Sequence, residues 1–278
     1  MNKIFKVIWS KSKQCYVVVS ELAKNTTGKK KIVVASVFAA LAMTGNVAQV
    51  DAAGRFWGTA PAKGIAISTT DLGSTASANG DNAIAIGRAN ANYNGAVAIG
   101  SDALSVGNGV SMGWGATASG SNGTSLGMQT TASGSNATAV GAYSKATDSS
   151  ATAFGNGANA SAANAIAMGT SAAASDASAT AIGNGANASN SNAIAIGTNA
   201  AASDSAATAL GYGANAGNTG TVAIGYGANV IGYTSIAIGN SASATGGTSG
   251  VIGDGASSTV SLGTALGKGA KVNNQDSV

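Results

Sequence analysis

Residues 191–204 read SNAIAIGTNAAASD, and this 14-residue pattern recurs along most of the 278-residue chain. Ile194 and Ile196 alternate with alanine, and a side-chain period of two predicts a short strand. Gly197 then permits a tight turn, and a second alternation of small residues follows over 200–202. A helix is excluded because its apolar residues would recur at spacings of three and four. Two strands and two turns in each unit predict one coil of a β-solenoid, so the expected fold class is all-β.

The glycine that follows the first strand recurs in every coil. Each is followed by the next at position i+14 from Gly113 to Gly267, and at position i+13 in the two coils before that. A chain that copies one short unit is typical of a scaffold or an extended surface. We expect these glycines to form the turns of the repeat. They are Gly87, Gly100, Gly113, Gly127, Gly141, Gly155, Gly169, Gly183, Gly197, Gly211, Gly225, Gly239, Gly253 and Gly267.

Stacking the coils in register places equivalent residues in columns. We expect the large residue before each glycine to face the core, together with the residue two positions earlier. The Ala or Ser between them should point the other way and pack against another surface, from which we infer self-association. Fifteen such coils at about 4.8 Å each would make a rod of roughly 70 Å. The expected core residues are Ile86, Ile99, Met112, Leu126, Val140, Phe154, Met168, Ile182, Ile196, Leu210, Ile224 and Ile238.

The composition argues against an ordinary enzyme. The chain has no histidine, the commonest general base and metal ligand, and its one cysteine, Cys15, lies in the leader. We therefore expect no catalytic, cofactor-binding or metal site, and the sequence does not identify the ligand-binding residues. Eight of the 14 Lys and Arg residues precede position 52, and the remainder of the chain has six basic and eight acidic residues. Nucleic-acid binding thus loses its main support.

The leader has the order of a secretory signal peptide. Three lysines at 29–31 precede the 12-residue apolar run IVVASVFAALAM and a segment of small residues. We predict cleavage after Ala52 or Ala53. A transmembrane anchor is the alternative, but a bilayer span needs about 20 apolar residues.

The leader and the repeats each resemble segments of one known family of proteins. Residues 1–31, MNKIFKVIWSKSKQCYVVVSELAKNTTGKKK, are similar to the extended signal peptide region of large autotransporters, with Tyr16 in place of the usual Trp. The segments NAIAIGRAN, GAVAIGSDA, NAIAMGTSA and NAIAIGTNA, which begin at Asn82, Gly95, Asn164 and Asn192, resemble the head repeat of YadA-like trimeric autotransporter adhesins. The resemblance implies a left-handed parallel β-roll and three chains packed side by side as a homotrimer. It also implies export to the cell surface and binding to host matrix proteins, host cell-surface receptors or other bacteria.

The expected organisation is a removed signal peptide over 1–52, a lead-in over 53–71 and head repeats over 72–278. Members of the family continue through a neck, a coiled-coil stalk and a membrane barrel, whereas the next glycine after Gly267 would fall beyond Val278. We therefore expect a truncated product or an N-terminal fragment with no membrane anchor of its own, periplasmic or secreted if it is complete.

Two other function classes compete with the adhesin. An ice-binding solenoid would use a flat threonine array such as Thr138, Thr152, Thr180 and Thr208, but Ile and Val interrupt this column, which we expect to face inward. An enzymatic solenoid would need a catalytic constellation that the sequence lacks.

Three aspartates, Asp148, Asp176 and Asp204, recur at the same place on every second coil. They could form a row that binds a cation or a basic partner, and we prefer the interpretation that they occupy solvated turns.

Overall fold

The computed structural model describes residues 5–10, 15–20, 64–67 and 76–274. The chain divides into two compact units, Met1–Met43 and Thr44–Val278. In the first unit, β1 (Phe5–Ser10) and β2 (Cys15–Ser20) pair antiparallel. The predicted cleavage residues Ala52 and Ala53 lie outside the described residues.

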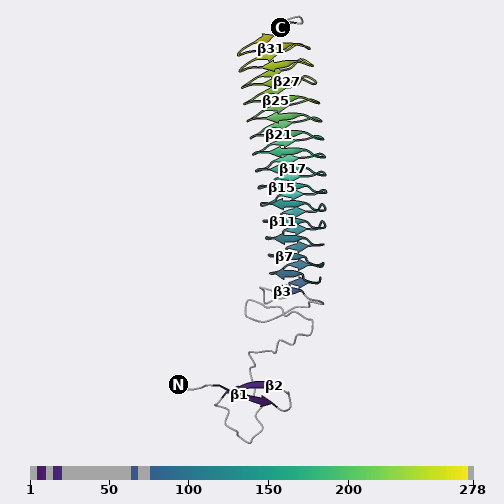
Figure 1. Cartoon of the computed structure of the whole chain (residues 1–278), viewed down its shortest axis with the longest axis vertical. Helices are drawn as coiled ribbons and strands as arrows, with labels where there is room; N and C mark the ends of the chain where they lie inside the picture. Colours follow the sequence, from purple (N-terminus) through teal and green to yellow (C-terminus); the bar gives the residue numbers. More distant parts are fainter. Residues whose placement is uncertain (1–4, 11–14, 21–63, 68–75, 275–278) are drawn as a thin grey trace. The chain divides into compact units, whose positions relative to one another are not determined.

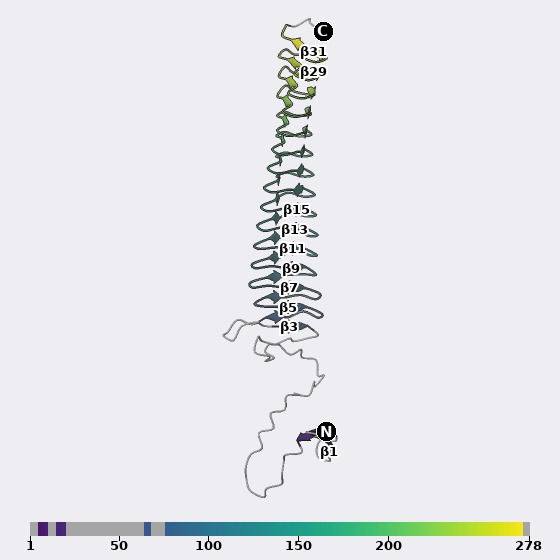
Figure 2. The same ribbon diagram turned by 90° about the vertical axis from the view of Figure 1, so that its left-hand side faces the viewer.

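The second unit is a parallel β-solenoid with two sheets of 15 strands each (Figures 1 and 2). The odd-numbered strands form one sheet: β3 (Ile65–Ile67), β5 (Ile84–Ile86), β7 (Val97–Ile99), β9 (Val110–Met112), β11 (Thr124–Leu126), β13 (Thr138–Val140), β15 (Thr152–Phe154), β17 (Ile166–Met168), β19 (Thr180–Ile182), β21 (Ile194–Ile196), β23 (Thr208–Leu210), β25 (Val222–Ile224), β27 (Ile236–Ile238), β29 (Gly250–Ile252) and β31 (Thr264–Leu266).

The even-numbered strands form the other sheet: β4 (Ser77–Ala78), β6 (Asn90–Ala91), β8 (Leu104–Ser105), β10 (Thr117–Ala118), β12 (Thr131–Ala132), β14 (Lys145–Ala146), β16 (Asn159–Ala160), β18 (Ala173–Ala174), β20 (Asn187–Ala188), β22 (Ala201–Ala202), β24 (Asn215–Ala216), β26 (Asn229–Val230), β28 (Ser243–Ala244), β30 (Ser257–Ser258) and β32 (Lys271–Val272). The described residues contain no helix, and therefore no helix long and apolar enough to span a membrane.

Each strand pairs with the equivalent strand of the next coil. In β21 and β23, for example, Ile194 lies opposite Thr208 and Ile196 opposite Leu210. The backbone amide of Ile194 donates to the carbonyl of Ala207 at 2.8 Å, so hydrogen bonds run along the stack from coil to coil. The prediction of an all-β parallel solenoid with 14-residue coils is confirmed.

The core, however, is made of alanine, and the predicted assignment of inside and outside is wrong. Ala193 and Ala195 are fully buried, whereas Ile194 is 37% exposed. No side chain larger than valine is fully buried in the described residues. A coil that reverses direction after two or three residues brings its two sheets so close that only small side chains fit between them. The alanines of one sheet therefore pack on those of the other, and they are not free to contact a second chain.

The twelve residues expected in the core lie on the outer surface of the odd-numbered sheet instead, each half-buried or exposed. They are Ile86, Ile99, Met112, Leu126, Val140, Phe154, Met168, Ile182, Ile196, Leu210, Ile224 and Ile238. The residues two positions earlier, Thr138, Thr152, Thr180 and Thr208 among them, share this outer surface.

The structure explains why the glycine after each odd-numbered strand recurs so strictly. Every one of the fourteen has a positive φ, from 88° at Gly87 to 146° at Gly253. At Gly183, φ is 136° and a β-carbon would lie 2.5 Å from the carbonyl oxygen of Gly197 in the next coil. Both the backbone conformation and the close approach of the neighbouring coil exclude a side chain there.

Candidate interaction surfaces

The outer surface of the odd-numbered sheet is an extended apolar face. Two columns of side chains run along it, one of Ile, Val and Thr that is interrupted at Gly250, and one of Ile, Leu, Met, Val and Phe. Phe154 is 53% exposed and Leu210 is 41% exposed. Fifteen strands spaced about 4.8 Å apart, each about 10 Å long, give this apolar face an area of roughly 700 Å². The largest apolar patch on a typical monomer is about 300–600 Å² and often marks an interaction site.

The outer surface of the even-numbered sheet is a polar face with little charge. Its residues are mostly Asn, Thr and Ser, with Lys145 and Lys271 as the basic residues of its strands. Hydroxyl groups donate to carbonyls one coil further on, as Ser133 Oγ does to Thr147 at 3.3 Å. The amide of Asn215 donates to that of Asn229 at 2.8 Å. This polar face presents hydrogen-bonding groups over the length of the solenoid without a basic patch for nucleic acid.

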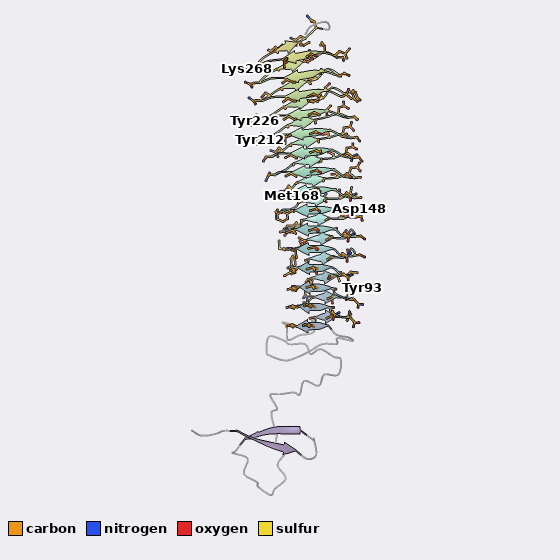
Figure 3. All side chains as sticks on the ribbon, in the orientation of Figure 1. Tyr93, Asp148, Met168, Tyr212, Tyr226 and Lys268 are labelled. Carbon is orange, nitrogen blue, oxygen red and sulfur yellow. The ribbon has the colours of Figure 1, made fainter. Side chains whose placement is uncertain are left out.

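A pair of stacked tyrosines lies on the edge that carries the glycine turns. The rings of Tyr212 and Tyr226 are parallel within 7°, with centroids 5.1 Å apart, and Figure 3 shows them side by side. This pair was not predicted from the sequence. The available signal was that each tyrosine directly follows a glycine of the repeat, Gly211 or Gly225, so that stacking in register makes them neighbours.

The opposite edge carries the aspartates that recur on every second coil, among them Asp148 (Figure 3). The Oδ1 atom of Asp148 accepts a hydrogen bond of 2.6 Å from the next backbone amide, and that of Asp204 accepts one of 2.7 Å. Asn190 and Asn218 make the same bond in other coils. Because an uncharged amide does this as well as a carboxylate, the aspartates cap turns. In the described part of the chain, no group of three or more His, Cys, Asp or Glu residues could hold a metal ion.

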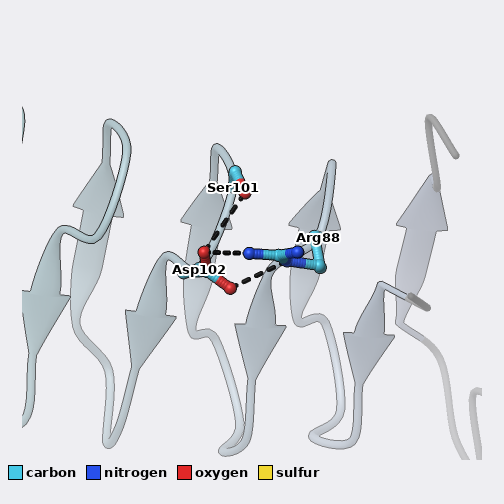
Figure 4. Close-up of polar contacts among 3 residues, drawn as sticks. All are labelled: Arg88, Ser101 and Asp102. Atoms are coloured by element: carbon cyan, nitrogen blue, oxygen red, sulfur yellow. Dashed lines mark hydrogen bonds and ion pairs between the residues drawn. The ribbon is translucent and has the colours of Figure 1, made fainter.

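One ion pair joins two neighbouring coils near the start of the described solenoid (Figure 4). Arg88 Nε donates to Asp102 Oδ1 at 2.8 Å, and Arg88 Nη2 contacts Asp102 Oδ2. Ser101 Oγ donates to the same carboxylate at 3.3 Å. The hydrogen bond from Arg88 holds the pKa of Asp102 below its usual value, and the bond to Asp102 raises the pKa of Arg88. Both side chains are about half exposed, so the pair is typical of a surface contact between coils.

Comparison with known proteins identifies both parts of the chain. Residues 1–49 match the Extended Signal Peptide of Type V secretion system. The YadA head domain repeat matches residues 72–90, 107–130, 132–158, 160–186, 174–200, 188–214 and 202–228, and the repeat described for that family contains two copies of the unit. A comparison with curated proteins found no significant match.

A solved structure, the crystal structure of the collagen-binding domain of the Yersinia adhesin YadA, is 20% identical in sequence. The alignment covers 77% of this chain and 78% of that one, with a TM-score of 0.17. The head-repeat matches cover half of the sequence and coincide with the parallel solenoid, while the extended signal peptide precedes them. The chain belongs to the YadA head family of surface adhesins.

Proposed function

We propose that this chain is exported and acts as the head region of a surface adhesin. The observation that supports this most is the run of YadA head repeats over half of the chain behind an extended signal peptide. The bound partner would be a host matrix protein, a host cell-surface receptor or another bacterium. Binding would use an extended repetitive surface and no chemical step.

We further propose that the head works as a side-by-side homotrimer. The apolar face, at roughly 700 Å² per chain, approaches the area of about 800 Å² that each partner buries in a standard specific interface. Residues such as Phe154 and Leu210 would lose water on association, which stabilises an oligomer. The polar face and the two edges would then remain available to the ligand.

A pair of matched variants tests the homotrimer. Ile182→Asp with Ile196→Asp places two charges on the apolar face, and Asn187→Asp with Ala201→Asp places two on the polar face. Light scattering on the full chain should give a trimer for the unchanged protein and for the polar-face variant, and a monomer for the apolar-face variant. A monomeric unchanged chain, or equal loss in both variants, would refute this interface.

Adhesion is tested by coating beads with the full chain and measuring retention on immobilised matrix proteins, on host cells and on bacteria. Retention on any of these that free chain competes away supports the proposal. The absence of retention on all three counts against it.

Ice binding receives no support from the comparisons. The threonine column lies on the exposed apolar face, so the expectation that it faces inward is wrong. The same face carries Met, Leu and Phe side chains of unequal size, which do not form the flat lattice that ice binding requires. A thermal hysteresis measurement separates the two functions.

The residue boundaries of the signal peptide (1–52) and of the head repeats (72–278) stay predictions. We propose removal of residues 1–52 on export, with cleavage after Ala53 as the second choice. Sequencing the amino terminus of the exported chain distinguishes these two sites, and a terminus at Met1 would refute both.

A further inference from the structure

The repetition of the apolar face creates a problem for any assembly of identical chains. Equivalent residues recur about every 4.8 Å along the solenoid, so one chain can slide against its neighbour by one coil and lose contacts only at the ends. In a cyclic oligomer the copies are parallel and residues of the same number lie at the same height. A uniform repetitive face specifies this register weakly. The following inference rests on the self-association proposed above.

The first column of the apolar face is not uniform in its central part. From Thr152 to Thr208, threonine and isoleucine alternate coil by coil, with Ile166 between Thr152 and Thr180 and Ile194 between Thr180 and Thr208. In register, each threonine hydroxyl meets the same hydroxyl of the neighbouring chain. A slip of one coil in either direction places Thr180 and one of the other two threonine hydroxyls against an isoleucine. A buried hydroxyl without a partner is unfavourable.

A slip of two coils restores the alternation, and a second feature is needed to exclude it. Phe154 is the one aromatic residue in either column among the described strands, and it lies opposite Val140 of the preceding coil in the sheet. The largest side chain of its column thus stands beside the one valine of that column. In a two-coil slip, Phe154 of one of the two chains lies at the height of Ile182 of the other, between Met168 and Ile196, where no valine leaves such a space.

We propose that the apolar face sets its own register when copies of this chain associate. The Thr–Ile alternation from Thr152 to Thr208 excludes a slip of one coil, and Phe154 beside Val140 excludes a slip of two coils. This mechanism works through unfavourable contacts in the wrong register, which is how a repetitive interface becomes specific.

Single-cysteine cross-linking tests this in the full chain, because Cys15 is the sole cysteine and Cys15→Ser gives a cysteine-free background. Ile224→Cys and Ile252→Cys lie in the same column, two coils apart and away from the central residues. Chains with one or the other cysteine, distinguished by a tag of different length, are coexpressed and treated with a disulfide-forming oxidant. A disulfide needs α-carbons within about 7 Å, whereas two coils are separated by about 9.6 Å.

The unchanged face should give disulfides only between identical positions. Phe154→Ile should add a disulfide between positions 224 and 252, comparable in yield with the disulfides between identical positions. Leu126→Ile, a matched change in the same column, should not. A parallel experiment with Ile224→Cys and Ile238→Cys, one coil apart, should show no increase in Phe154→Ile because the Thr–Ile alternation remains.

Each part of the proposal is refuted by a different outcome of these experiments. If Phe154→Ile still gives only identical-position disulfides, or if the unchanged face already gives the 224–252 disulfide, Phe154 does not exclude the two-coil slip. An increase in the one-coil disulfide refutes the role of the alternation. A chain that forms no disulfide at either position and is monomeric by light scattering refutes the self-association beneath the inference.

Discussion

At the scale of single residues, the repeating glycines carry a structural demand that no other residue type meets. Gly183 has a φ of 136°, and a β-carbon there would approach the Gly197 carbonyl to 2.5 Å. Gly183→Ala should lower the free energy of unfolding by about 3 kcal/mol, since backbone strain of this kind costs about 1–3 kcal/mol before any clash is counted. Thermal and urea unfolding followed by circular dichroism measures the loss.

Gly213 provides the matched control for that substitution. Its φ is 61°, and a β-carbon would meet nothing within 4 Å. Gly213→Ala should therefore cost only about 1–2 kcal/mol, the usual cost of the left-handed conformation. Equal losses in the two variants would show that the approach of the neighbouring coil does not constrain Gly183.

The ion pair between Arg88 and Asp102 predicts a pH dependence at the same scale. Its hydrogen bond lowers the folded-state pKa of Asp102, so its stabilising contribution is present above the unfolded pKa of about 3.9 and is lost as pH falls through the lower folded value. Asp102→Asn should melt slightly below the unchanged chain at pH 7, and the two should converge once the pH has fallen below the folded-state pKa of Asp102. Asp204→Asn should show no difference at pH 7, because an asparagine caps the equivalent turns. A gap for Asp102→Asn that persists at low pH would contradict this account.

At the scale of the strand, the assignment of inside and outside makes a strong prediction. Ala195 is fully buried in β21, and no fully buried side chain of the described residues is larger than valine, so Ala195→Leu overfills the space between the sheets. Overpacking of this kind costs typically about 1–3 kcal/mol. Ile196→Leu on the apolar face changes no volume and should stay within about 0.5 kcal/mol. Urea unfolding midpoints measure both losses. A larger loss for Ile196→Leu than for Ala195→Leu would instead support a core made of the isoleucines.

The strand also shows what the sequence could predict and what it could not. The 14-residue spacing specified the coils, the turns and the parallel stacking. An alternating strand such as β21, however, gives the same pattern whichever face is buried, and the choice of Ile194 and Ile196 for the core followed hydrophobicity instead of size. A better signal was present in β20, where Ala188 stands between Asn187 and Ser189 and must face inward. Two alanines spaced two residues apart recur every seven residues, once per strand, as at Ala193 and Ala195 and again at Ala200 and Ala202, and these alanines are buried.

The features of the outer surfaces could be predicted only in part. The turn role of Asp204 could be anticipated because Asn occupies the equivalent position in neighbouring coils. The stack of Tyr212 on Tyr226 depends on the place of both residues in the repeat, directly after its glycine, and the spacing of aromatic residues along the whole chain does not indicate it. An apolar face could not be predicted while its residues were assigned to the core.

At the scale of the whole solenoid, each described strand contacts only strands of its own coil and of the two neighbouring coils. The stability of such an array is approximately the sum of the coils and of the interfaces between them. Deletion of residues 184–197 removes one complete coil and joins Gly183 to Thr198, which reproduces the Gly197–Thr198 junction. The shortened chain should fold and lose about one-fifteenth of its stability, because each sheet has 15 strands.

Deletion of residues 191–197 is the matched control for coil removal. It takes out half a coil, including β21, and joins Asn190 to Thr198, so every later strand is displaced from one sheet to the other. The displaced strands keep their alanines inward, because buried alanines recur every seven residues. Asp204 and Asn218, however, move to the positions of Gly197 and Gly211, where a positive φ and the carbonyl of the neighbouring coil exclude a side chain. The full-coil deletion should therefore retain the strand spectrum in circular dichroism and a sharp melting transition, and the half-coil deletion should lose both. Equal behaviour of the two would mean that the coil is not the unit from which this solenoid is built.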